Sequence, residues 1–257
     1  MKTNALGFTA LTLLALGITA PSVQAQTVYS GADLNAGPGD PHPNSASAAA
    51  SFDTAAGTLG TVHLIDFESA PLGTFTSLTA ATGVTLTGSD YKGNPLYVNN
   101  TPNFPSGIPL DGFNTTPGGS QYVEQIGGTS TFTFSTPIQA FGLYLPGVQI
   151  GFYQDNLTFN DGTSQTINVP AQLPSDRFNG SLSFVGFTDA GKFITQVTIT
   201  ASNNFGADAI GIDDVRFVTS APPATTPEPG TLALLAGMGI SGSAFLARRR
   251  KQIHKVL

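Results

Sequence analysis

The chain of 257 residues has no cysteine and no tryptophan, and only 10% of its residues are charged. The absence of cysteine excludes disulfide frameworks, thiolate zinc sites, iron–sulfur clusters and cysteine nucleophiles. The three histidines, His42, His63 and His254, are far apart in the sequence, so a histidine-clustered metal site is not expected. With 40% hydrophobic residues the chain can still bury a core, which excludes a collagen or a disordered acidic tail.

Positive charge is also scarce, since 10 Lys and Arg residues stand against 16 Asp and Glu residues and the net charge is −6. Residues 26–226 hold 15 of the carboxylates and only 4 of the cations, so the remaining cations lie near the two ends. The middle of the chain is therefore acidic, and nucleic acid is not an expected partner.

The first 25 residues have the three parts of a secretory signal peptide. Lys2 is followed by an apolar run over residues 10–20, and Val23-Gln24-Ala25 has the small-x-small pattern of a cleavage site. The run is shorter than the roughly 20 residues that cross a bilayer. We therefore expect export by the secretion machinery and cleavage between Ala25 and Gln26.

The C-terminal end combines a short motif, an apolar run and a basic cluster. Pro227-Glu228-Pro229 precedes an apolar run of 17 residues, 231–247, which is at the lower limit of a membrane-spanning helix. Three arginines follow the run directly, at Arg248, Arg249 and Arg250. Because basic clusters stay on the cytoplasmic side, this arrangement predicts a single transmembrane helix with the acidic body outside.

This ordered combination resembles the PEP-CTERM sorting domain of exported bacterial proteins, on the motif, the single apolar helix and the arginine run at residues 227–251. The resemblance implies processing by exosortase in a Gram-negative bacterium that makes exopolysaccharide. It implies a protein anchored in the inner membrane before processing and then found at the cell surface or in the extracellular matrix of a biofilm. Residues 252–257 would form a short cytoplasmic tail.

The body between these two signals divides by composition. Residues 26–60 are rich in Ala, Ser and Gly and predict an N-terminal extension with one possible short helix, capped by Asn44 or Ser45 and pinned by Phe52. Residues 61–218 are expected to form the folded domain. Residues 219–226 form a spacer rich in Pro and Thr that would separate this domain from the sorting signal.

Alternation with a period of two runs through residues 61–218. Phe132 and Phe134 alternate with threonines, as do Val197 and Ile199, which is typical of half-buried strands. Asn160-Asp161-Gly162 lies between two such segments and predicts a hairpin turn. About ten short strands with no helical pattern between them predict an all-β fold, an antiparallel β-sandwich or jelly roll.

Carboxylates occur in the first and last expected strands of this domain. The first strand contains Asp66 and Glu68, and the last contains Asp213 and Asp214. The Phe-Glu and Ile-Asp-Asp-Val patterns resemble jelly-roll carbohydrate-binding modules, in which matching positions contribute to a structural calcium site that joins these strands. The resemblance implies calcium held by Glu68, Asp213 and Asp214, whose oxygens are ligands that calcium prefers. The alternative is that the two aspartates pair with Arg216 or Arg177 without a metal.

Known catalytic motifs are absent from the sequence. There is no G-x-S-x-G elbow, no H-E-x-x-H helix and no P-loop, and His63 is expected on a strand surface rather than as a base. A glycosidase would need two carboxylates across a sugar cleft, and the sequence offers no means of choosing a pair.

Aromatic residues are frequent in a loop-rich stretch from residue 89 to residue 128. They could stack sugar rings, or they could fasten a long loop onto the sandwich, which we favour. The residues concerned are Tyr91, Tyr97, Phe104, Phe113 and Tyr122. The sequence thus favours a non-catalytic binding or structural module, with exopolysaccharide as a candidate ligand, over a secreted polysaccharide hydrolase.

Overall fold

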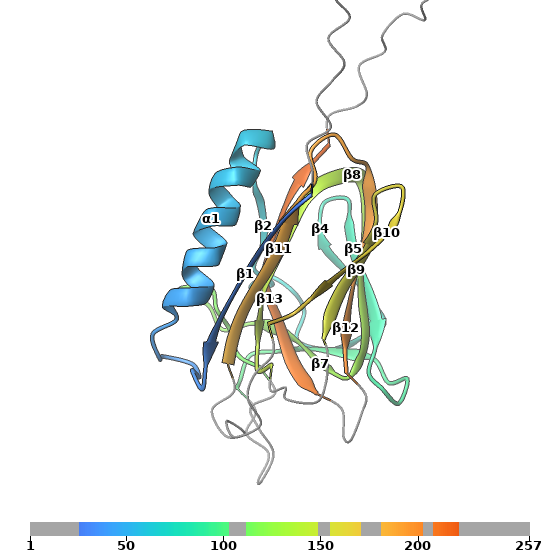
Figure 1. Ribbon diagram of the computed structural model, residues 1–257. Helices are drawn as coiled ribbons and strands as arrows, with labels where there is room; N and C mark the ends of the chain where they lie inside the picture. The colour runs from blue at the N-terminus through green and yellow to red at the C-terminus, as the bar shows by residue number, and fades with distance from the viewer. Residues whose placement is uncertain (1–25, 103–111, 149–154, 171–180, 203–207, 221–257) are drawn as a thin grey trace, which may run out of the picture. The chain divides into compact units, whose positions relative to one another are not determined.

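The computed structural model describes residues 26–102, 112–148, 155–170, 181–202 and 208–220. Within these ranges the chain forms one helix and thirteen strands (Figure 1). The helix is α1 (Pro43–Leu59). The strands are β1 (Thr27–Leu34), β2 (His63–Ile65), β3 (Gly73–Phe75), β4 (Ser77–Ala81), β5 (Val84–Ser89), β6 (Leu96–Asn99), β7 (Tyr122–Ile126), β8 (Gly128–Pro146), β9 (Asn156–Asn160), β10 (Ser164–Asn168), β11 (Ser181–Thr188), β12 (Ile194–Ala201) and β13 (Ala209–Thr219).

Every strand pairing is antiparallel, which agrees with the predicted all-β sandwich. The side chains of alternate positions, Phe132 and Phe134 on β8 and Val197 and Ile199 on β12, are buried in one large apolar cluster. The predicted hairpin is also present, because β9 and β10 pair from Asn160 and Ser164 outward. The period-two pattern therefore marked both the strands and the face that each one buries.

Strand β8 is 19 residues long and organises the domain, because its two halves have different partners. The first half pairs with β5 and β12, and the second half pairs with β11 and β13. Pairing with β5 stops at Phe134, and pairing with β13 reaches only as far as Ile138. Pro137 lies in the interval between them, where a residue without a backbone N–H costs no ladder hydrogen bond.

The first and last strands of the predicted domain are neighbours. Strand β2 pairs with β13, so that Ile65 lies opposite Val215 and His63 lies opposite Phe217. The strand ends at Ile65, however, and Phe67 has a positive φ of 57°. Asp66 and Glu68 are therefore not on one face of a continuous strand, as simple alternation predicts.

The N-terminal segment is part of the sheet, which corrects the predicted start of the folded domain at residue 61. All eight residues of β1 pair with β11, from Thr27 opposite Thr188 to Leu34 opposite Ser181. Strand β1 was missed because its apolar residues do not alternate regularly with polar ones.

Helix α1 follows β1 and packs against the sheet, as Figure 1 shows. It spans 17 residues, so it is longer than the short helix expected. Phe52 is fully buried against Ala140, Phe184 and Val218, which confirms its predicted anchoring role. The cap differs from the prediction, because the Asp33 carboxylate of β1 accepts hydrogen bonds from the backbone amides of residues 44 and 45 and from the Ser45 hydroxyl.

Among the described residues, no helix has the length and apolar character needed to cross a bilayer. The predicted signal peptide, residues 1–25, and the predicted transmembrane helix, residues 231–247, both lie outside the described ranges. The spacer beyond Ser220 and the tail at residues 252–257 lie outside them as well.

Candidate functional site

A β-bulge in β13 places the two predicted aspartates side by side in the protein interior. The register of β13 against β8 shifts between Asp213 and Arg216, and Asp214 has a positive φ of 47°. A regular strand would point these neighbours to opposite faces, whereas the bulge brings both carboxylates to the same loop. The exposed fraction is 0% for Asp213 and 5% for Asp214.

This loop, residues 112–121, is called the carboxylate-bound loop below. The Asp213 carboxylate accepts hydrogen bonds from the Thr115 amide at 2.6 Å and the Thr115 hydroxyl at 2.9 Å. The Asp214 carboxylate accepts one from the Thr116 hydroxyl at 2.7 Å. The loop packs tightly on β13, because a Cβ atom added to Gly112 would lie 2.7 Å from the backbone of Gly211.

Glu68 binds the other end of the carboxylate-bound loop. Its carboxylate accepts hydrogen bonds from the backbone amides of Ser120 and Gln121, each at 2.9 Å, and its own carbonyl accepts one from the Gln121 side chain. The structure thus brings all three predicted calcium ligands to one loop. They hold its backbone and hydroxyl groups, with Glu68 at one end and Asp213 and Asp214 at the other.

The donor set fits calcium in its chemistry, because it consists of carboxylate oxygens in an acidic body. Within the described residues, however, no three His, Cys, Asp or Glu side chains come close enough together to hold a metal. Backbone carbonyls and water would have to complete the six to eight oxygens that calcium takes. The ion pair with Arg216, which is the alternative to a metal, is present, because the Arg216 guanidinium lies 3.9 Å from the Asp214 carboxylate. Arg177 lies outside the described residues.

The electrostatics of this region are unfavourable for two ionised aspartates. Burial raises the pKa of Asp213 to about 7, and the charge of Asp214 beside it adds to the effect. The hydrogen bonds from Thr115 oppose this rise but do not cancel it. A positive charge close to Asp213 would therefore stabilise the folded state at neutral pH.

A cleft of about 420 Å³ adjoins the carboxylate-bound loop. Arg216 lines it, with its guanidinium 5.1 Å from the Tyr144 ring centre and 3.3 Å from the Asp53 carboxylate. His42 stacks on Phe113 at 5.9 Å, and its Nε2 atom is buried without a hydrogen-bond partner in the described structure. The cleft is lined by Pro38, Gly39, Asp40, His42, Ala46, Phe113, Asn114, Thr115, Pro117, Tyr144, Leu182, Asp214 and Arg216.

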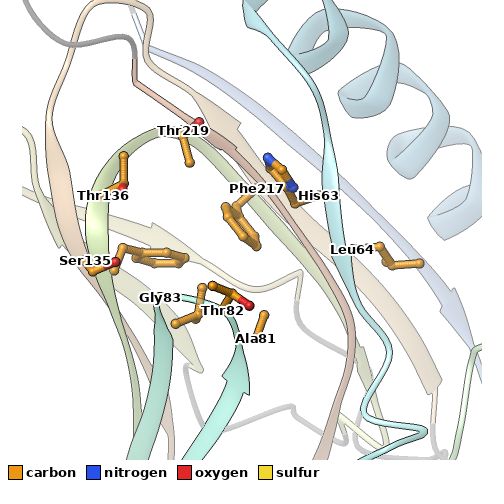
Figure 2. A pocket seen from close by; sticks show the side chains of 11 residues that line it. His63, Leu64, Ala81, Thr82, Gly83, Ser135, Thr136, Phe217 and Thr219 are labelled. Carbon is orange, nitrogen blue, oxygen red and sulfur yellow. The ribbon is translucent and has the colours of Figure 1, made fainter.

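A separate groove of about 430 Å³ lies where β8 changes partners. His63 is exposed on β2, as expected, and stacks on Phe217 with ring centres 5.0 Å apart. In Figure 2 the Phe217 ring lies in the middle of the groove. This groove could not be predicted from the sequence, because it forms between β2, β8, β13 and the β4–β5 turn and no local pattern joins them.

The aromatic residues of the loop-rich stretch take different positions. Phe113 and Tyr122 are buried, and the Tyr122 hydroxyl donates to the carbonyl of Thr101, so these two residues anchor the chain as we favoured. Tyr91 and Tyr97 are 44% and 42% exposed, and each could still stack a ligand. Phe104 lies outside the described residues.

Comparison with known proteins identifies the C-terminal signal. Residues 225–251 match the family model described as the PEP-CTERM protein-sorting motif. The match covers Pro227, Glu228, Pro229 and the arginines that begin at Arg248, all of which lie outside the described structure, as does Ala25. This motif implies an exported protein that exosortase sorts and that is membrane-anchored before cleavage. No curated protein matches the chain.

Two solved structures resemble part of the chain at low sequence identity. The cleaved adhesin domain K2 of Lys-gingipain is 16% identical, with a TM-score of 0.39 over 62% of this chain and 99% of that chain. The catalytic domain of a GH87 α-1,3-glucanase is also 16% identical, with a TM-score of 0.28 over 62% of this chain and 31% of that one. At these TM-scores neither likeness carries an argument about function. The chain is therefore identified by its sorting signal, as a protein that carries the PEP-CTERM motif.

Proposed function

We propose that this chain is a surface or extracellular-matrix protein whose β-sandwich is a non-catalytic binding or structural module. The PEP-CTERM motif at residues 225–251 supports export and processing by exosortase. The acidic composition of residues 26–226 suits an extracellular body that stays soluble and resists self-association. The ligand that we propose for it is a glycan of the matrix, bound in the cleft around Arg216.

The groups that line the cleft are typical of sugar recognition. Tyr144 offers a half-buried ring face, and the free Nε2 atom of His42 can exchange a hydrogen bond with a hydroxyl group. Arg216 is held by Asp53, Asp214 and the Tyr144 ring, so its guanidinium is positioned before a ligand arrives. A volume of about 420 Å³ is within the range of small-molecule sites.

The state of the carboxylates in the cleft supports binding over hydrolysis, and this observation carries the proposal. A glycosidase needs one carboxylic acid that donates a proton and a second carboxylate that is free to attack or to activate water. The described cleft has two carboxylates, Asp40 and Asp214. Asp40 is exposed and accepts a hydrogen bond from the Gly37 amide, while Asp214 is bound to Thr116 and lies next to Arg216.

A glycan array combined with a reducing-sugar assay tests this function. We expect the secreted protein to bind one class of polysaccharide without releasing reducing ends. The His42→Ala variant should bind more weakly, whereas Lys92→Ala, a change away from the cleft, should bind like the parent. Release of reducing sugar by the parent would instead establish the alternative, a polysaccharide hydrolase.

Mass spectrometry of the native product tests the processing. The N-terminal peptide should begin at Gln26, and the peptides that contain Arg248, Arg249 and Arg250 should be missing from the extracellular form. Deletion of residues 227–229 should leave the protein in the membrane fraction. A full-length product in the cytoplasm would contradict both proposed signals.

A further inference from the structure

The groove beside His63 and Phe217 has a rim of polar side chains that form no hydrogen bond within the described structure. Neither His63 nor any hydroxyl of this rim has a hydrogen-bond partner among the described residues. The hydroxyl groups belong to Thr82, Ser135, Thr136 and Thr219. The rim therefore keeps its donors and acceptors available to a ligand.

The floor of the groove is aromatic and rigid. The rings of Phe217 and Phe134 lie 5.3 Å apart and belong to the main core, with only 6% and 4% of their surfaces exposed. His63 extends this surface, because its ring stacks on Phe217 at an angle of 23°. Figure 2 shows the Phe217 and His63 rings together at the groove. Because so little of the two phenylalanine rings is exposed, the exposed His63 ring provides most of the aromatic surface that a ligand can contact.

The groove also lacks fixed charge. Its described lining contains no Asp, Glu, Lys or Arg, although the body as a whole is acidic. A charged ligand would lose water without gaining an opposite charge, so a neutral ligand is favoured. An aromatic amino-acid side chain would be neutral as well, but it would bury the rim hydroxyls without giving them partners.

We propose that this groove is a second ligand site, which takes a neutral sugar ring. The C–H face of the ring would lie on the exposed His63 ring, which Phe217 supports from below, and its hydroxyl groups would bind the hydroxyls of Thr136 and Thr219. The site arises from the topology, because the gap between the partners β5 and β13 leaves Ser135 and Thr136 without a strand partner on that edge of β8. It is separate from the cleft and does not depend on the function proposed there.

NMR titration of the folded body with methyl β-D-glucopyranoside, methyl β-D-galactopyranoside and methyl α-D-mannopyranoside tests this site. At least one of these should shift the methyl signals of Thr136 and Thr219 and the ring signals of His63. The dissociation constant should be about millimolar, as is usual for a ligand of this size. Sodium glucuronate, an anionic sugar, should bind at least fivefold more weakly.

Variants separate this site from the cleft. His63→Ala and Thr136→Val change exposed side chains, so they should fold normally and weaken the binding at least fivefold. Thr74→Val, an exposed threonine on β3, and His42→Ala in the cleft should leave it unchanged. The proposal is overturned if no methyl glycoside shifts the groove signals, or if p-cresol shifts them and the glycosides do not. Loss of groove binding in His42→Ala would also overturn it, because the two sites would then be one.

Discussion

The carboxylate of Asp213 accepts two hydrogen bonds from Thr115, a residue 98 positions earlier in the chain, at 2.6 Å and 2.9 Å. These bonds fix the carboxylate-bound loop to the bulge of β13. Because Asp213 is fully buried, each bond replaces water that the carboxylate has lost. These two hydrogen bonds make the carboxylate-bound loop part of the stable domain.

Thr115→Val tests how much the hydrogen bond from the Thr115 hydroxyl contributes to the free energy of unfolding. The change removes the hydroxyl donor but keeps the shape of the side chain and the backbone amide. Because hydrogen bonds to charged groups contribute about 1.5–3 kcal/mol, we expect the free energy of unfolding to fall by about that amount in urea titrations. Thr74→Val, which removes an exposed hydroxyl on β3, should change the free energy of unfolding by less than about 0.5 kcal/mol. Equal effects in the two variants would contradict the role of Asp213.

Both β2 and β13 could be predicted as strands, because Ile65 and Val215 lie in apolar runs of strand type. That the two strands are neighbours was implied only by the resemblance to jelly-roll carbohydrate-binding modules. The positions that Asp213, Asp214 and Glu68 take could not be predicted, because they depend on a bulge and on a positive φ at Phe67. Neither the bulge nor the positive φ is signalled by a glycine in the sequence, so neither could be predicted from residue type.

The structure of the N-terminal segment could not be predicted from its composition either. Ala, Ser and Gly predicted a weakly structured extension, yet β1 becomes the edge strand beside β11 and α1 covers the sheet. The only strong local signal was Phe52, a single large apolar residue in a run of small ones. Tertiary packing therefore decides the state of this segment, and composition alone does not.

Phe52→Ala should detach α1 from the sheet. The ring packs against Phe184 at 5.7 Å and against Tyr29 at 5.8 Å, and it is fully buried. Removing a buried phenylalanine typically costs about 3–5 kcal/mol, so we expect a loss of this size in denaturant unfolding. Ser47→Ala, an exposed position on the same helix, should lie within about 0.5 kcal/mol of the parent. A small effect of Phe52→Ala would show that the helix is not anchored here.

Asp189 gives the domain a pH-dependent stability. Burial, together with the neighbouring Asp161, raises the pKa of Asp189 to about 6, although Lys192 opposes the rise. An acid whose folded-state pKa is raised binds its proton more tightly in the folded state than in the unfolded state. Its destabilising effect therefore appears as the pH rises from about 4 to 6 and is complete above about pH 6.

Asp189→Asn should consequently stabilise the protein at pH 7.5, by about 1–3 kcal/mol, and have little effect at pH 4. Asp161→Asn is the matched control of opposite sign. The Thr163 amide and hydroxyl, with other donors, lower the pKa of Asp161, so the loss of its charge should destabilise the fold at pH 7.5. Denaturant unfolding of the three proteins at both pH values measures these differences. If Asp189→Asn is neutral at pH 7.5, the burial cost assigned to this carboxylate is wrong.

Calcium bound at Asp213 and Asp214 should raise the melting temperature of the body. The buried Asp213 carboxylate lies beside Asp214, and a divalent cation at this point would relieve their repulsion. A ligand that binds only the folded state contributes about 2.7 kcal/mol at a hundredfold excess over its dissociation constant. We expect a rise with millimolar calcium that chelator reverses, and a smaller one with magnesium, which demands a tighter octahedral set of ligands.

The double variant Asp213→Asn with Asp214→Asn should abolish the calcium shift. Asp90→Asn is the control, because this carboxylate serves a local turn through Lys92 and Asn94 and should leave the shift intact. Asparagine can still accept hydrogen bonds from Thr115 and Thr116, so the double variant should fold, and circular dichroism would check this. An unchanged calcium shift in the double variant, or no shift in the parent, would contradict a calcium site at these two carboxylates.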